Sequence, residues 1–450
     1  MTNDLHALSA IRFGTGLPAP EGSTTPEAML AALAGPDLAA AQWPGVDAMD
    51  IQATYREAAR LRRDVRRDAS LRPAYQQATR AAQAQQTQGM LVQMARGVGT
   101  DHGFRERLVQ FWADHFTTEA RFRHDVGLTA AMVEHAIRPH VGGRFGDMLV
   151  AVTLHPAMLL YLDQVQSVGP GSPAGQRRGA GLNENLAREL LELHTLGVGA
   201  GYDQADVRQA AELLTGLTAD PEQGFFFNPR MAEPGPETVL GRSYAGEGLE
   251  PVLTLLADLA RHPDTARHLA RKLAVHFISD TPDAGLVDDM AAAYLAADGA
   301  LAPVYGAMLA HPTAFAAPAQ KARQPFDFMV AAMRALEVPP AEILGMARGE
   351  ARKRLLLPMQ AMGQTWGKPG GPDGWEEEAS AWITPQGMAA RITWAMSAPD
   401  DLGRSPDARA FVQHALGNRA SERLIWAVNA SENQREGLGL VLASPEFNRR

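Results

Sequence analysis

The chain has no cysteine among its 450 residues, and its aromatic residues make up only 6% of the total. The first absence excludes disulfides, thiolate zinc sites and cysteine nucleophiles, while it leaves the cellular compartment open. The sequence also has no run of about 18 apolar residues, so we expect no membrane-spanning helix. Basic residues do not exceed acidic ones, because the formal net charge is −9. A sequence-independent nucleic-acid binder needs an excess of clustered Lys and Arg, and this class is therefore disfavoured.

The strongest basic segment is RLRRDVRRD, from Arg60 to Asp68. Its arginines are interleaved with Asp64 and Asp68 at helical spacing. We interpret the segment as a solvated helix face in preference to a nucleic-acid patch.

The composition favours helices, because alanine is abundant and strand signals are scarce. We predict a mainly α protein, a large multi-helix globular fold with long irregular loops and little or no β-sheet. At this length the chain is long enough to bury an extensive core. We expect one helical domain over residues 1–450, with an N-terminal helical part to about residue 100, a motif-bearing core over about 101–280 and a C-terminal helical part from about 281.

The most informative segment runs from Gly181 to Leu217 and begins GLNENLARELLELHTLGV. On a helix of about 100° per residue, its polar residues gather on one side, within an arc of about 140°. They are Glu184, Asn185, Arg188, Glu189, Glu192 and Thr195. The leucines fill the other side, and His194 falls among them, which favours a buried core histidine over a ligand.

Two interpretations of this acidic face remain open. Arg188 stands four residues from both Glu184 and Glu192, so its guanidinium can pair with both carboxylates in a solvent-exposed ladder. Alternatively, Asn185, Glu189 and Glu192 point into a polar cavity, where the carboxylates bind a cation or move protons. The di-iron signature Glu-x-x-His is absent, because Glu192 and His194 are only two residues apart.

Several blocks occur in an order that resembles one large bacterial family. They are FWADHF at Phe111–Phe116, IRPHVGGRFGDML at Ile137–Leu149, HPAMLLYLD at His155–Asp163, NENLARELLELHTLGV, GYDQADV, RKLAVHF at Arg271–Phe277, the pairs Gly363-Gln364 and Gly374-Trp375, and the closing SPEF. The chain resembles, over nearly its full length, the family catalogued as domain of unknown function 1800. The resemblance implies no activity. It implies that many members are exported and that some are encoded beside a sulfatase-like companion family, a possible protein partner.

The chain also departs from the family pattern. Between Met231 and Gly241, Ala232 stands where related sequences usually have histidine, and Glu237 stands where they have lysine. Leu217 replaces a common tryptophan, and Asp114 replaces a more usual asparagine. These differences imply an altered or weakened site. The N-terminus shows no basic, apolar signal pattern, so the chain as written predicts a cytoplasmic protein.

Two functions fit these observations. We favour a binding or scaffold protein whose internal Glu/Arg/His polar network, including Glu184, Asn185, Arg188 and Trp112, locks helices together. The alternative is a metal-dependent hydrolase or oxidoreductase in which Glu189, Glu192 and His115 bind a divalent metal or act as acid and base. No cofactor is assigned beyond that possible metal.

Overall fold

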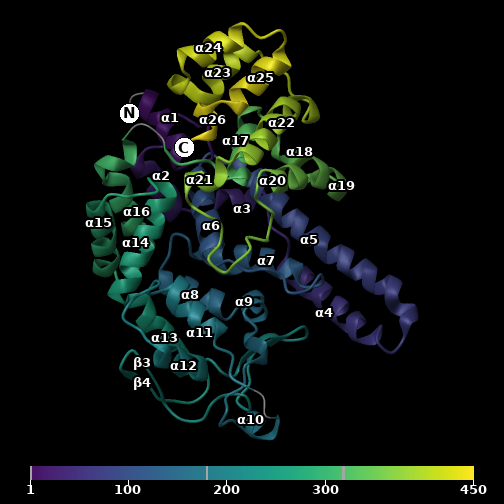
Figure 1. Cartoon of the computed structure of the whole chain (residues 1–450), viewed down its shortest axis with the longest axis vertical. Coiled ribbons are helices and arrows are strands. Elements are labelled where there is room, and N and C mark those ends of the chain that lie inside the picture. The colour runs from purple at the N-terminus through teal and green to yellow at the C-terminus, as the bar shows by residue number, and fades with distance from the viewer. Residues whose placement is uncertain (1–2, 179–180, 317–319) are drawn as a thin grey trace.

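A computed structural model describes residues 3–178, 181–316 and 320–450 (Figure 1). Helices account for 64% of the residues and strands for 4%, which confirms the predicted fold class. The division into parts at about residues 100 and 280 stays a prediction. Within the described residues, none of the helices combines the length and the apolar character needed to cross a bilayer.

Several helices of the N-terminal part begin at side-chain caps. Asp37 and Asp47, for example, accept hydrogen bonds from the first free backbone N–H groups of the helices that follow them. The elements are α1 (Asn3–Arg12), α2 (Pro26–Ala34), α3 (Leu38–Gln42), α4 (Ala48–Asp64), η1 (Ala69–Leu71), α5 (Arg72–Gly99), α6 (Gly103–His115), α7 (Val126–Met132), η2 (Val133–Ile137) and η3 (Arg138–His140).

The middle part continues with helices and two small hairpins. The helices are α8 (Phe145–Thr153), α9 (Pro156–Tyr161), η4 (Gln164–Gln166), α10 (Pro173–Arg178), α11 (Asn185–Glu189), η5 (Leu190–His194), α12 (Gln204–Leu213), α13 (Glu250–Arg261), α14 (Pro263–Phe277), α15 (Ala284–Ala296), α16 (Leu301–Ala310) and η6 (Pro312–Phe315). Strand β1 (Leu217–Asp220) pairs antiparallel with β2 (Gly224–Phe227), and β3 (Glu237–Val239) pairs with β4 (Arg242–Tyr244). The first hairpin turns where Asp220 accepts two backbone hydrogen bonds and Gly224 takes a positive φ of 72°.

The C-terminal part forms the top of the molecule in Figure 1. Its elements are α17 (Pro325–Ala335), α18 (Pro340–Leu344), α19 (Arg348–Ala351), η7 (Arg352–Leu356), α20 (Leu357–Ala361), α21 (Ala379–Trp382), α22 (Pro385–Asp401), α23 (Ala408–Leu416), η8 (Gly417–Arg419), α24 (Glu422–Asn429), α25 (Gln434–Ala443) and α26 (Pro445–Asn448). A long loop joins α20 to α21.

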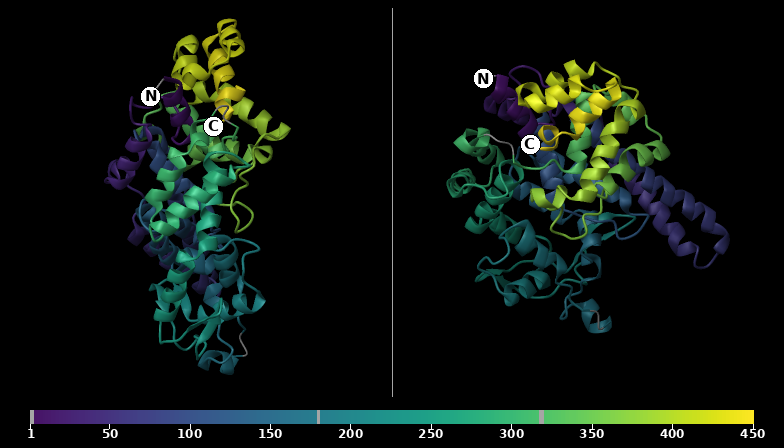
Figure 2. Two further views of the ribbon diagram at one scale, coloured as in Figure 1. Left: turned by 90° about the vertical axis from the view of Figure 1, so that its left-hand side faces the viewer. Right: turned by 45° about the horizontal axis from the view of Figure 1, so that its top comes forward.

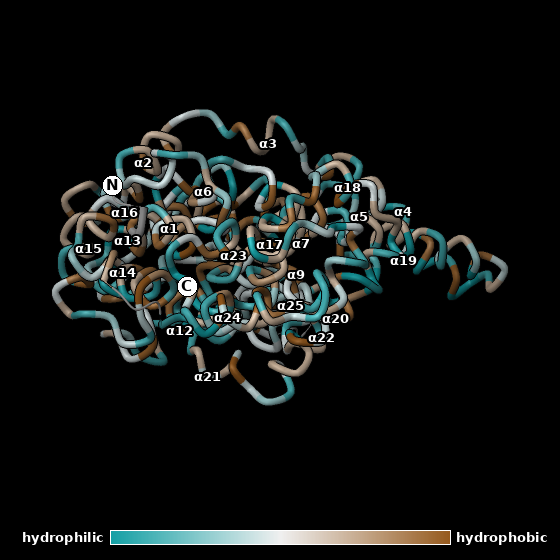
Figure 3. Tube along the Cα trace, turned by 90° about the horizontal axis from the view of Figure 1, so that it is seen from above, coloured by the Kyte–Doolittle hydropathy of each residue, from teal (hydrophilic) through white to brown (hydrophobic). Residues whose placement is uncertain are grey.

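The buried apolar residues form two large clusters. The first gathers residues between Phe13 and Ala314, and the second joins the later half of α5 to the helices from α17 onwards. Helix α5 therefore has two roles. Its second half belongs to the second core, whereas its first half pairs with α4 in an arm that projects from the body (Figures 1 and 2). Seen from above, the arm extends well beyond the rest of the trace (Figure 3).

Candidate functional site

The acidic helix predicted from the sequence is present, but it changes type halfway. After one turn of α-helix in α11, residues Leu190–His194 form the π-helix η5. Such π segments occur frequently at functional sites. Arg188 pairs with both Glu184 and Glu192 at 3.3 Å, and it also donates to Gln204. The three charged side chains are about one-third exposed, with fractions of 38%, 32% and 26%. The ladder is therefore a surface feature, not an internal one.

The other members of the predicted network are separated from this ladder. Asn185 is exposed, and its backbone N–H donates to the side chain of Asn183. Trp112 is fully buried, and its indole donates to the Tyr305 hydroxyl at 2.8 Å. Glu189 is half-buried, and burial raises its pKa, with Glu192 contributing in the same direction.

His115 lies in a group of three buried or largely buried histidines. Its ring centroid is 6.2 Å from those of His194 and His268. His115 Nε2 contacts the carbonyl of His194, and His268 Nε2 contacts that of Leu193. Burial, assisted by the charge of Lys272, lowers the pKa of His194 to about 3 and that of His268 to about 4. These imidazoles are neutral at physiological pH, and the prediction that His194 is a buried core residue is confirmed.

Within the part of the chain that the structure describes, no group of three His, Asp or Glu side chains is arranged to hold a metal ion. Glu189, Glu192 and His115 do not gather into such a group. Their proposed acid, base or metal-binding roles stay predictions from the sequence.

A different buried charge network joins the two cores. Arg107 of α6 contacts Asp327 of α17, and the C-terminal Arg450 approaches the same carboxylate at 3.4 Å. Arg107 also donates to His276 Nε2 at 2.7 Å, while His276 Nδ1 contacts Glu377 at 2.5 Å. Because an arginine can only donate, His276 accepts at Nε2 and carries its proton on Nδ1. Burial lowers the pKa of His276, which agrees with this neutral form.

A well-formed cleft lies beside this network, between the two cores. It has about 870 Å³ of empty space, part of it open to bulk solvent. Its walls come from α5, α6, α7, α17 and the loop between α20 and α21. The polar lining consists of Gln86, Gln93, Gln110, Asp114, Thr117, Thr118, Thr129, Gln324, Asp327 and Gln364, and the larger apolar surfaces are Met90, Met132, Phe326, Trp366 and Trp375.

Three of the cleft glutamines have no hydrogen-bond partner among the described residues. They are Gln86, Gln93 and Gln110, on two successive helices of the cleft wall. By contrast, Gln364 accepts from the backbone of Phe326 at 2.8 Å and donates to Gln324 at 3.3 Å. The first three amides thus keep both donor and acceptor capacity for a bound molecule.

The cleft contains two carboxylates in different states. Asp327 faces Arg107 and Arg450, so its charge is compensated. Asp114 accepts a hydrogen bond from the backbone N–H of Trp375 at 2.9 Å, yet burial raises its pKa to about 7. None of the lining residues is Arg, Lys or His. The cleft therefore offers no cationic group to an anionic ligand.

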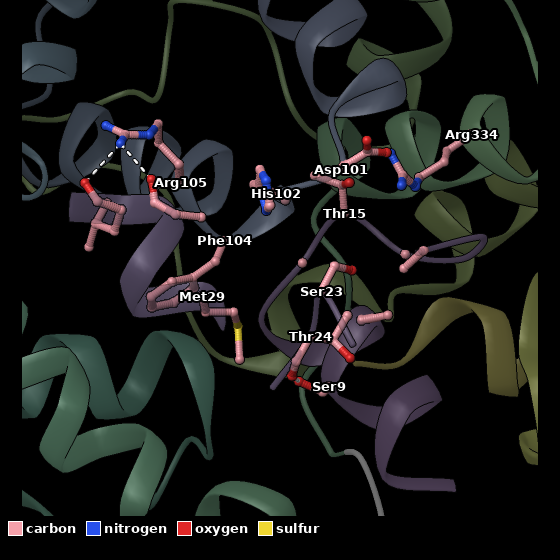
Figure 4. Close-up of a pocket in the computed structure, with 17 residues that line it drawn as sticks. Ser9, Thr15, Ser23, Thr24, Met29, Asp101, His102, Phe104, Arg105 and Arg334 are labelled. Carbon is pink, nitrogen blue, oxygen red and sulfur yellow. Dashed lines mark hydrogen bonds between the residues drawn. The ribbon is translucent and has the colours of Figure 1, made fainter. Parts of the chain in front are cut away.

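A second hollow, near the N-terminus, is shown in Figure 4. Two arginines line it, but both already donate hydrogen bonds to backbone carbonyls. Arg105 donates to the carbonyls of Ala32, Leu33 and Gly35, and Arg334 donates to four other backbone carbonyls. We interpret this hollow as a gap between packed segments and not as a ligand site.

Sequence reasoning missed most of the cleft. The glutamines of α5 and α6 fall on helices with no distinctive spacing, and no site residue was predicted on the loop that supplies Trp366 and Trp375. One signal was present. The family blocks include the Gly363-Gln364 and Gly374-Trp375 pairs, and Asp114 belongs to the FWADHF block. These distant blocks meet at the cleft.

The fold and cleft define a large helical protein with an amide- and indole-lined recess that has no Arg, Lys or His among its described lining residues. A family model described as "Protein of unknown function (DUF1800)" matches residues 16–449, and the chain belongs to this family. Comparisons with curated proteins and with solved structures find no match.

Proposed function

We propose that the protein is a binding protein whose cleft accepts a short, uncharged, hydroxyl-rich ligand, that is, a saccharide. The proposal rests on one cleft that brings together two tryptophans and three glutamines without hydrogen-bond partners among the described residues.

The chemistry of the wall matches the two kinds of surface on a sugar ring. Each glutamine amide offers two donors and an acceptor, which suits hydroxyl groups that both donate and accept. An indole presents a broad apolar face with a negative quadrupole, which packs against the C–H face of a ring. Trp366 is held by stacking on Phe326, with ring centroids 5.0 Å apart. Its orientation is thus set before the ligand arrives, which lowers the entropic cost of binding.

The carboxylates in the cleft favour a neutral ligand over a charged one. A phosphate or carboxylate would lie near Asp114 and Asp327 without any lining Arg, Lys or His to pair with. A cationic ligand would compete with the two arginines that already neutralise Asp327. A neutral ligand avoids both desolvation costs.

The proposal is tested by titration calorimetry with soluble oligosaccharides, namely β-linked glucose and N-acetylglucosamine oligomers and α-linked glucose oligomers. We expect at least one class to bind. Trp366→Ala should weaken that binding about tenfold, the equivalent of about 1.4 kcal/mol. Gln110→Ala should weaken it about fivefold, because one net hydrogen bond is lost.

The matched control is Trp426→Ala. Trp426 lies on α24, is 71% exposed and does not line the cleft. The control should bind as the unaltered protein does, and thermal melts should show that each variant is folded. Failure of all the oligosaccharides to bind, or equal weakening by Trp426→Ala, would contradict the proposal.

A further inference from the structure

The arm formed by α4 and the first half of α5 carries a concentration of arginines. Residues 56–80 contain eight arginines and three acidic residues, a net charge of +5 in a chain whose net charge is −9. The remainder of the molecule therefore carries −14.

Among the described residues, two arginines of the arm near the body form ion pairs, whereas those at the tip do not. Arg56 pairs with Glu222, and Arg60 pairs with Glu57 and Asp64. Farther out, four arginines are exposed and form no ion pair among the described residues: Arg63, Arg66, Arg67 and Arg72. The sequence predicted a solvated helix face balanced by Asp64 and Asp68. In the structure Asp64 pairs with Arg60, and Asp68 accepts hydrogen bonds from Ser70, so neither compensates the tip.

The arm holds this charge away from the body. Between Arg72 and Thr87, where α5 begins its deeply buried stretch, fifteen residues of helix span roughly 22 Å. That distance exceeds twice the Debye length of about 8 Å at physiological ionic strength. A surface that touches the tip is thus largely screened from the acidic body, as the projection in Figures 1 and 3 makes plain.

We propose that the tip of the arm docks on an anionic lipid bilayer surface. Guanidinium groups bind phosphate oxygens in a bidentate fashion, and several of them reach a flat surface at once from a convex tip. An extended anionic plane would repel a molecule of charge −9 that lay flat on it, so a projecting contact suits this occupant in particular. The partly buried Val65, Leu71 and Tyr75 lie between the tip arginines and supply a small apolar and aromatic surface at headgroup depth.

A nucleic acid fits the same tip less well. The major groove is about 12 Å wide and admits a single helix, whereas the tip is two helices wide. The arm also lacks exposed Phe or Trp side chains for stacking on single-stranded bases.

The experiment is co-sedimentation of the full chain with vesicles of phosphatidylcholine and phosphatidylglycerol in equal amounts, and with vesicles of phosphatidylcholine alone. We expect binding to the anionic vesicles only, and a loss of binding as salt is raised. Each basic residue near such a surface strengthens binding about fivefold, so the triple variant Arg66→Gln, Arg67→Gln, Arg72→Gln should bind about a hundredfold more weakly.

The matched control removes three exposed arginines of α14, α23 and α24, in Arg271→Gln, Arg409→Gln, Arg423→Gln. It should retain binding, because its charges are remote from the tip. No binding to anionic vesicles, or equal loss in both triple variants, overturns the proposal. Binding of the tip to single-stranded RNA in the absence of vesicle binding also overturns it. None of these readouts depends on a saccharide in the cleft.

Discussion

Glu237 is a carboxylate placed where carboxylates are poorly tolerated. It lies on β3, only 5% exposed, and burial raises its pKa to about 7, with Glu212 and Glu233 contributing in the same direction. The family resemblance implies a lysine at this position, which would pair with those two neighbours. This departure from the family pattern therefore costs stability, because Glu237 adds a third carboxylate beside Glu212 and Glu233.

We predict that Glu237→Gln stabilises the protein at pH 8 but not at pH 4. A raised pKa in the folded state means that the stability contributed by the neutral carboxyl is lost as pH rises from about 4.5 to about 7. Glutamine removes that loss, and we expect a gain of about 1 to 2 kcal/mol after allowance for solvent screening. Urea denaturation at the two pH values measures this gain in the free energy of unfolding. The exposed Glu432→Gln serves as the control, and an equal gain at both pH values would contradict the explanation.

At the scale of elements, the two charge networks should differ widely in strength. The ladder on α11 and η5 is partly exposed, so each pair contributes about 0.3–0.5 kcal/mol, and Arg188→Ala should cost less than about 1 kcal/mol. Asp327→Asn should cost about 3–5 kcal/mol, because it leaves two buried guanidinium groups without their shared carboxylate. Denaturation of both variants in one buffer measures the two losses of unfolding free energy. Losses of similar size would contradict the view that burial determines how strongly each network stabilises the protein.

The same elements show what the sequence could predict. Helical spacing correctly paired Arg188 with Glu184 and Glu192, because such pairs depend only on local geometry. It also placed His194 in the core. It could not predict the π-helix, nor decide between a solvent-exposed ladder and a polar cavity, since both depend on the packing of α12 and α14 around it. The contact of Arg107 with Asp327 joins residues 220 positions apart and leaves no periodic signal.

At the scale of the whole molecule, the buried histidines should govern acid stability. The folded pKa values of His194 and His268, about 3 and about 4, lie below the ordinary value of 6.5. The unfolded chain therefore binds protons first, and stability is lost as pH falls from about 6.5 towards 3 to 4. We predict that His268→Gln flattens this decline. Denaturation midpoints from pH 7.5 to 4 test it against the exposed His135→Gln, and an unchanged slope in His268→Gln would refute the assignment.

The overall architecture was the part most open to prediction, because alanine-rich composition and helical periodicity act throughout the chain. The cleft was the least predictable part. Its glutamines lie on α5 and α6, its tryptophans on a loop about 250 residues later, and only the meeting of the two cores brings them together.

Hydrogen–deuterium exchange, with and without the tightest-binding oligosaccharide, would show whether the ligand lies in the cleft. A saccharide in the cleft should slow exchange in peptides that cover residues 86–93, 110–118 and 364–375, and it should leave those of α11 and η5 unchanged. Protection confined to α11 and η5, or no protection anywhere at saturating oligosaccharide, would contradict the assignment of the cleft as the binding site.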